Sequence, residues 1–183
     1  AHCGATALRL DVADEASFGN LSRALDGGGL DVAIYNAGVL GPQNEGAIPC
    51  PAADFDTVMH TNVLGALRAI PIVAPALARR NGVFAFLSST MGSIAQQSSA
   101  RRVVYRASKA ALNSVVKTAS IEWGAKGVTC ISLHPGWVKT DMGGSDADID
   151  PATSIEGMKR VIAGTSTADN GRFFDYTGKE QPW

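Results

Sequence analysis

The chain has few residues that could form a disulfide or a metal site. The 183-residue sequence has three cysteines and three histidines, and they are scattered along it. Cys3, Cys50 and Cys130 are odd in number and far apart, which excludes a disulfide framework. No cysteine or histidine pair has the spacing of zinc ligands, so we expect no metal. The pattern indicates a reducing, cytoplasmic setting, in which each thiol is a small buried side chain.

Strong net charge and long apolar runs are also missing. The formal net charge is −1, which argues against nucleic acid or an anionic membrane as the main partner. There is no run of 18 apolar residues and no basic start followed by an apolar stretch, so we expect no membrane span and no secretory signal. With 45% apolar residues the chain can bury a core, and residues 1–183 are expected to form one domain.

Short apolar segments alternate with longer amphipathic ones. We expect strands at residues 7–10, 31–35, 82–87, 128–133 and 173–176, and helices at residues 12–25, 54–80, 101–126 and 151–163. Asp14 is the expected N-cap of the first helix, and Pro71 and Pro75 are expected to disturb the second. Near-continuous apolar strands separated by helices are typical of a parallel sheet covered on both faces, so the predicted fold class is α/β.

Polar or small residues follow several of these strands. They are Asp11, then Asn36, Ala37 and Gly38, then Ser88 and Ser89, and finally Pro135 and Gly136. Ligands of open parallel sheets bind beyond the carboxyl ends of the strands. The sequence therefore predicts a ligand site at this edge of the sheet.

Tyr105 and Lys109 are candidates for acid/base chemistry. They are four residues apart in an expected helix, so they lie on one face of it. A phenol has a pKa of about 10, and a nearby ammonium lowers that pKa because it favours the phenolate. Such a pair can exchange protons at neutral pH. The alternative is a surface tyrosine beside a solvated lysine, which this spacing alone does not exclude.

Ser89 and Asn62 each have a functional and a structural interpretation. Ser89 follows a buried strand, where its hydroxyl can donate to a substrate carbonyl oxygen or simply cap a loop. Asn62 shares an apolar helix face with Val58 and Ala66, so its amide must find hydrogen-bond partners. Those partners can be structural, or they can include a water that leads to Lys109.

Together these motifs resemble the short-chain dehydrogenase/reductase family. They are Asn36 to Gly38, Asn62, Ser89, Tyr105 with Lys109, and residues 135–140, in the order and approximate spacing of that family. The resemblance runs from about residue 7 to residue 183. Residues 88–94, 105–112, 132–144 and 173–183 are similar to the carbonyl reductase subgroup of the C-factor and sniffer type.

The resemblance implies a Rossmann-like, doubly wound parallel sheet and NAD(P)-dependent reduction of a ketone or aldehyde, or oxidation of the alcohol. Tyr105 would protonate the carbonyl oxygen, and Lys109 would lower the pKa of Tyr105 and hold the nicotinamide ribose. Ser89, the second serine of the pair, would bind the substrate oxygen, and Asn62 would anchor a proton-relay water.

The resemblance also implies how NAD or NADP would bind. Asp11 and Val12 would contact the adenine end. The remaining expected cofactor-binding residues are Asn36, Ala37, Gly38, Tyr105, Lys109, Pro135, Gly136, Val138 and Thr140. The expected partners are a small carbonyl or alcohol substrate and further copies of the chain, in a homodimer or homotetramer.

The chain departs from the family pattern at its start. The family's glycine-rich phosphate-binding turn is absent, because Gly27, Gly28 and Gly29 precede a strand instead of following one. We therefore expect that the fold lacks its first βαβ unit and is truncated at the N-terminus. Residues 7–10 would then be unpaired, or paired with residues 31–35 or another chain, and residues 31–35 would form an exposed apolar edge. The alternatives to an enzyme are an inactive fragment and a signalling or interaction protein on the same fold.

Overall fold

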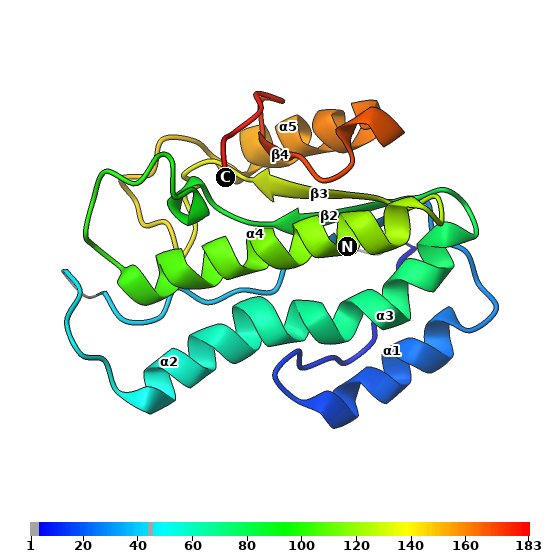
Figure 1. The fold of residues 1–183 in the computed structure, drawn as a ribbon, viewed down its shortest axis with the longest axis horizontal. Helices are drawn as coiled ribbons and strands as arrows, with labels where there is room; N and C mark the ends of the chain where they lie inside the picture. The colour runs from blue at the N-terminus through cyan, green and yellow to red at the C-terminus, as the bar shows by residue number, and fades with distance from the viewer. Residues whose placement is uncertain (1–3, 44–45) are drawn as a thin grey trace.

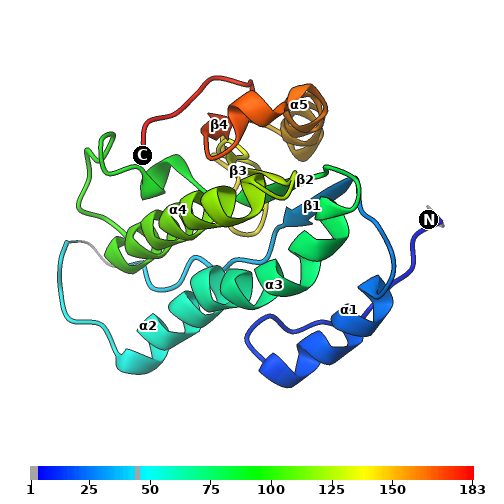
Figure 2. The ribbon, with the colours of Figure 1, turned by 45° about the vertical axis from the view of Figure 1, so that its right-hand side comes forward.

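The computed structural model describes residues 4–43 and 46–183. Its centre is a parallel sheet whose strands follow one another in chain order, as Figures 1 and 2 together show. The strands are β1 (Val32–Tyr35), β2 (Val83–Leu87), β3 (Thr129–His134) and β4 (Phe173–Asp175). Each pairs in parallel with the next, so the carboxyl ends of all four lie at one edge. The predicted α/β class is confirmed.

Helices cover both faces of this sheet. One face carries α2 (Ala52–Met59), α3 (Gly65–Ala78) and α4 (Val103–Gly124), with α1 (Phe18–Leu25) packed beside α3. The other face carries α5 (Pro151–Gly164), which lies on the opposite side of the sheet from α4 in Figures 1 and 2. Two apolar clusters follow from this layering. The larger joins Phe84 and Phe86 to α3 and α4, and the smaller joins Ile131 and Leu133 to α5.

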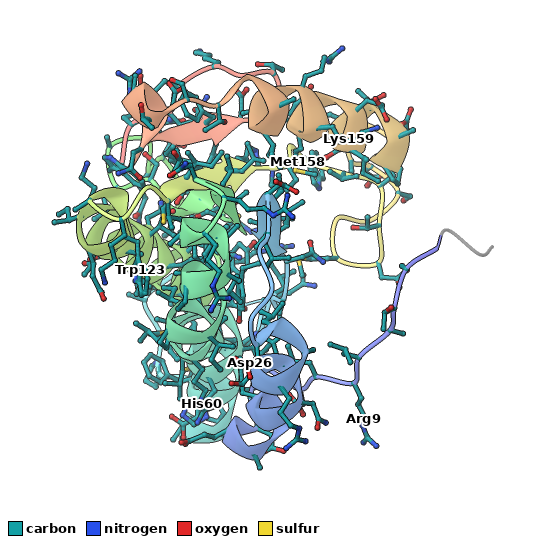
Figure 3. The ribbon with its side chains drawn as sticks, turned by 90° about the vertical axis from the view of Figure 1, so that its right-hand side faces the viewer. Arg9, Asp26, His60, Trp123, Met158 and Lys159 are labelled. Atoms are coloured by element: carbon teal, nitrogen blue, oxygen red, sulfur yellow. The ribbon has the colours of Figure 1, made fainter. Side chains whose placement is uncertain are left out.

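The expected strand at residues 7–10 is wrong. Those residues adopt no regular structure, and Leu8 and Leu10 are 48% and 37% exposed. Arg9 lies on a segment that runs away from the sheet in Figure 3. Within the described residues no strand pairs with the outer edge of β1, so residues 7–10 have no partner for backbone hydrogen bonds. Val32 and Ile34 of β1 are 43% and 53% exposed, which confirms the predicted apolar edge.

The second helix is disturbed at a different place from the one expected. Helix α3 runs through Pro71 and Pro75 without interruption. Pro71 is exposed, so water can satisfy the carbonyl that has lost its N–H partner. The irregularity is instead a π turn at His60–Leu64, between α2 and α3, and it contains Asn62.

Helix caps agree with the sequence pattern in part. Asp14 caps a 3-10 turn, Glu15–Ser17, by accepting a hydrogen bond from the N–H of Ala16, and α1 starts after that turn. Asp150 caps α5 through the N–H of Thr153, with Pro151 in the first turn. This cap sets the start of α5 near the carboxyl end of β3.

The apolar stretch Ala52–Ala78 is long enough, and has enough mean hydropathy, to cross a membrane. In this fold its buried face contributes to the core through Ala66, Val73 and Leu77, which accounts for its apolar character. The cysteines behave as small side chains. Cys130 is buried, which raises its pKa to about 12, while Cys50 is only half-buried. Cys3 lies outside the described residues. Among those described, no cluster of three metal-ligating side chains occurs.

Candidate active site

A cavity of about 730 Å³ opens at the carboxyl ends of the strands, where the sequence predicted a site. Leu87 and His134, the last residues of β2 and β3, line it together with the serines that follow β2. Tyr105 and Lys109 enter it from the first turns of α4. Residues from separate segments of the chain therefore share one wall, because parallel strands end at the same edge.

Tyr105 and Ser89 meet inside this cavity. Tyr105 is only 7% exposed, and Ser89 lies close enough to affect its hydroxyl. Burial raises the pKa of Tyr105, whereas the Ser89 hydroxyl and the positive charge of Arg102 lower it in part. Tyr105 is therefore a neutral phenol at pH 7, with a hydroxyl that can donate a hydrogen bond.

Lys109 lies under the tyrosine ring. Its Nζ is 5.7 Å from the centre of the Tyr105 ring and donates a hydrogen bond to the carbonyl oxygen of Leu87 at 2.8 Å. Burial lowers the pKa of Lys109 to about 8. The pair is inside the site, which excludes a surface pair. Burial dominates the pKa of Tyr105, with Ser89 and Arg102 opposing it, and the expectation that Lys109 also lowers this pKa stays a prediction.

The serines after β2 have distinct partners. Ser89 caps the 3-10 turn Thr90–Gly92 by accepting a hydrogen bond from the N–H of Met91 at 3.1 Å. Ser88 instead donates to the amide oxygen of Asn113 in α4. Ser93 is fully buried and accepts a hydrogen bond from the N–H of Gln96. Ser89 is thus both a cap and the serine that contacts Tyr105, so its two interpretations are compatible.

Asn62 holds the loop after β1. Its side chain is fully buried, and its amide nitrogen donates to the carbonyl of Val39 and to the hydroxyl of Ser108, both at 2.9 Å. Its amide oxygen accepts a hydrogen bond from the N–H of Val39 at 2.8 Å. The structural interpretation is therefore confirmed, and the water-relay role stays a prediction. A Cβ on the neighbouring Gly38 would lie 3.4 Å from the Nζ of Lys109, so this loop passes close to the lysine.

Most of the expected cofactor-binding residues line the cavity. They are Asn36, Gly38, Tyr105, Lys109, Pro135, Gly136, Val138 and Thr140. Ala37 packs against the core instead. Asp11 and Val12 lie away from the cavity lining, where Arg68 holds the chain by donating to the carbonyl of Ala13. Their expected contact with the adenine end therefore stays a prediction.

Other lining residues were not identified from the sequence. Arg102 and Arg106 come from the start of α4, Trp137 and Met142 from the loop after β3, and Met158 from α5. In the sequence, only the adjacent arginines at positions 101 and 102 stand out. An apolar residue on a loop or a helix cannot be recognised from the sequence as part of a ligand site. His134 also lines the cavity, and burial lowers its pKa to about 4 against the opposing charge of Asp175.

Comparisons with known proteins agree with this geometry. Residues 1–167 match the family model described as enoyl-(acyl carrier protein) reductase. The C-signal of Myxococcus xanthus is 42% identical over 164 residues, covering 85% of this chain and 94% of that protein.

Solved structures give the same result. The carbonyl reductase Sniffer of D. melanogaster superimposes with a TM-score of 0.90 at 29% identity, covering 96% of this chain and 77% of that one. The NADPH-bound carbonyl reductase from chicken fatty liver gives a TM-score of 0.84 at 33% identity, covering 96% and 76%. With the cavity and its Ser89, Tyr105 and Lys109, these matches show that the chain belongs to the short-chain dehydrogenase/reductase family of oxidoreductases.

Proposed function

We propose that this chain reduces a ketone or aldehyde with NADH or NADPH, or oxidises the corresponding alcohol, with Tyr105 as the acid/base. The observation that supports this proposal is that Ser89, Tyr105 and Lys109 line one cavity, with Ser89 close enough to Tyr105 to lower its pKa. A carbonyl oxygen between the two hydroxyls would receive two hydrogen bonds as negative charge develops on it. A cofactor would occupy the rest of the cavity, which is lined by Lys109, Gly38 and the loop after β3.

The residues present fit a nicotinamide cofactor. Lys109 is buried, and within the described residues its ammonium donates one hydrogen bond, to the Leu87 carbonyl, although it carries three donors. Its remaining N–H groups suit the hydroxyls of a ribose. Asn36 and Gly38 line one side of the same cavity, and Val138 and Thr140 line another, where backbone groups suit a carboxamide. When bound, the nicotinamide would donate or accept the hydride.

The chain's own residues would handle the proton. Ser89 would donate a hydrogen bond to the substrate oxygen and hold it beside Tyr105. Tyr105 stays protonated at neutral pH because burial raises its pKa, so in the reducing direction it would give its proton to the oxygen. Lys109 would hold the ribose, and a water near Asn62 would return a proton toward Lys109 and Tyr105. Asp11 and Val12 would lie toward the adenine end.

A titration and a pair of variants test this proposal. NADH and NADPH fluorescence is titrated with the full chain, and turnover of small ketones and aldehydes is followed at 340 nm. Tyr105→Phe is expected to reduce turnover by about 10²- to 10⁴-fold with nearly unchanged cofactor affinity. Lys109→Met is expected to lower both turnover and cofactor affinity, because Lys109 would bind the ribose and also support proton transfer. Tyr176→Phe removes a hydroxyl outside the cavity lining and is the matched control.

Two outcomes would contradict the proposal. Retained turnover in Tyr105→Phe would remove its role as the acid, and unchanged cofactor affinity in Lys109→Met would remove the ribose contact. Failure of NADH and NADPH to bind would instead favour the second candidate, a signalling or interaction protein. The observation that favours that candidate is the 42% identity to the C-signal. A cytoplasmic location and a homodimer or homotetramer remain part of the proposal.

A further inference from the structure

The wall of the cavity has an unbalanced charge. Within the described part of the chain, its lining includes Arg102, Arg106 and Lys109 but no aspartate or glutamate, and Arg101, which also lines it, has a partner of its own. Arg102 and Arg106 form no ion pair with any described carboxylate, whereas Arg68, Arg80 and Arg172 each pair with an acidic residue. The cavity therefore presents positive charge that the described part of the fold does not neutralise.

Both arginines are held at the cavity by the backbone. Arg102 precedes α4 with a φ of 59°, in the left-handed region that costs an ordinary residue about 1 kcal/mol. Arg106 is fixed by its Nε, which donates to the carbonyl of Arg101 at 2.8 Å. Within the described residues, the Nη groups of Arg106 make no hydrogen bond or ion pair with the protein. The fold thus places both arginines in the cavity lining, one of them in a strained backbone conformation.

Their arrangement is unfavourable without an anion. Arg102 precedes α4 and Arg106 lies in its first turns, so two positive charges stand at the positive end of the helix dipole. The first turn of α4 has no acidic residue, although the start of a helix favours negative charge. An oxyanion bound between the guanidinium groups would relieve both effects.

The arginines also lie close to the reacting groups. They flank Tyr105 in the chain, and the charge of Arg102 is near enough to lower the pKa of Tyr105. Elsewhere in the same lining are Trp137, Met142 and Met158, which form apolar surface. Met158 lies on the part of α5 that meets the sheet in Figure 3. The cavity thus combines two hydroxyls, a cationic wall and an apolar wall.

We propose that the carbonyl substrate carries an oxyanion, a carboxylate or a phosphate, which Arg102 and Arg106 hold while its carbonyl oxygen lies at Ser89 and Tyr105. Guanidinium groups bind both oxyanions with paired hydrogen bonds. The apolar part of the substrate would rest on Trp137 and the neighbouring methionines. This inference rests on the proposed function, since it names the substrate class of the same site.

Matched ketones test the inference. The full chain is assayed with NADPH and with 4-acetylbenzoate, 4-acetylphenylphosphonate and the neutral 4-acetylbenzamide. The better of the two anions is expected to exceed the amide in kcat/KM by at least about tenfold. Comparison of the two anions tells a carboxylate site from a phosphate site. Raising the salt concentration is expected to reduce the preference.

Charge-removing variants then locate the preference. Arg102→Gln and Arg106→Gln are each expected to lower the ratio of anion to amide kcat/KM by about tenfold. Arg160→Gln removes an exposed arginine of α5 outside the cavity lining and is expected to keep that ratio. Equal rates for the anions and the amide, or a ratio that neither variant changes, would overturn the inference. The inference would also be overturned if the main effect of Arg102→Gln and Arg106→Gln were a loss of NADPH affinity.

A binding measurement separates this inference from the proposed function. Calorimetry with 4-isopropylbenzoate and 4-isopropylbenzamide, which have no ketone, needs no turnover. The benzoate is expected to bind more tightly than the benzamide, and Arg106→Gln is expected to abolish this difference. That result supports the anion site even if no ketone is reduced, in which case only the proposed function fails. Turnover of all three ketones without preference, and equal binding of the two isopropyl compounds, would remove the anion site and leave the reductase activity standing.

Discussion

The Nζ of Lys109 donates a hydrogen bond to the carbonyl oxygen of Leu87 at 2.8 Å. Leu87 ends β2, so this contact ties the first part of α4 to the strand end just before Ser89. A buried ammonium is costly, and one carbonyl compensates for it only in part, as the lowered pKa of Lys109 shows. The same contact thus positions the lysine and makes its charge sensitive to pH.

Carbonyl reduction is expected to slow as the pH rises through about 8, the pKa to which burial lowers Lys109. The ammonium is present below that pH and lost above it, so ribose binding and the support it gives Tyr105 weaken on the alkaline side. The measurement is kcat/KM for NADPH-dependent reduction between pH 6 and 10, with cofactor Kd at each pH. A profile that stays flat to pH 10 would show that the charge of Lys109 is not needed.

Gly92→Ala is expected to reduce both stability and activity. A Cβ at this position would lie 2.7 Å from the carbonyl carbon of Lys109 and 2.9 Å from the backbone nitrogen of Ala110, so the turn after Ser89 would have to move off α4. Overpacking of this kind costs about 1–3 kcal/mol. Gly19→Ala in α1, where no atom lies within 4 Å, is expected to add up to about 1 kcal/mol. Urea unfolding and kcat/KM of both variants check this, and an unaffected Gly92→Ala would contradict the close packing.

Asn62→Ala is expected to lower the free energy of unfolding by about 3 kcal/mol, because the partly buried N–H and carbonyl of Val39 lose their partners and the buried Ser108 hydroxyl keeps only its bond to the Tyr105 carbonyl. The loop that carries Gly38 is expected to loosen, which lowers cofactor affinity. Asn20→Ala, on the exposed face of α1, is expected to change stability by about 0.5 kcal/mol or less. Urea unfolding with a cofactor titration measures both effects. Equal stability of the two variants would show that the Asn62 hydrogen bonds contribute little.

His134 is expected to make the fold less stable in mild acid. Burial lowers its pKa to about 4, so the folded state keeps the imidazole neutral while the unfolded chain binds a proton below about 6.5. Stability therefore falls as the pH drops from about 6.5 toward 4, by at most about 3 kcal/mol. The slope of Tm against pH in this range should be shallower in His134→Gln than in the exposed His60→Gln control. Identical slopes would contradict the prediction.

The sequence predicted the elements that depend on local pattern. Strand β2 and helix α5 differ from the expected ranges by one residue at one end, because apolar periodicity and caps such as Asp150 act over a few residues. The four-residue spacing of Tyr105 and Lys109 likewise placed both on one face of α4. Residues 7–10 have strand-like composition but form no strand, since a strand needs a neighbour to share its hydrogen bonds.

The chain by itself determined the fold class, the order of the elements and the identity of the Tyr105 and Lys109 pair. Only the tertiary structure decided that Ser89, and not Ser88, contacts Tyr105, and that Asn62 binds Val39. It also decided that burial, opposed by Ser89 and Arg102, sets the pKa of Tyr105. The physical reason is distance along the chain, because burial and hydrogen bonds between segments tens of residues apart depend on packing that no local pattern encodes.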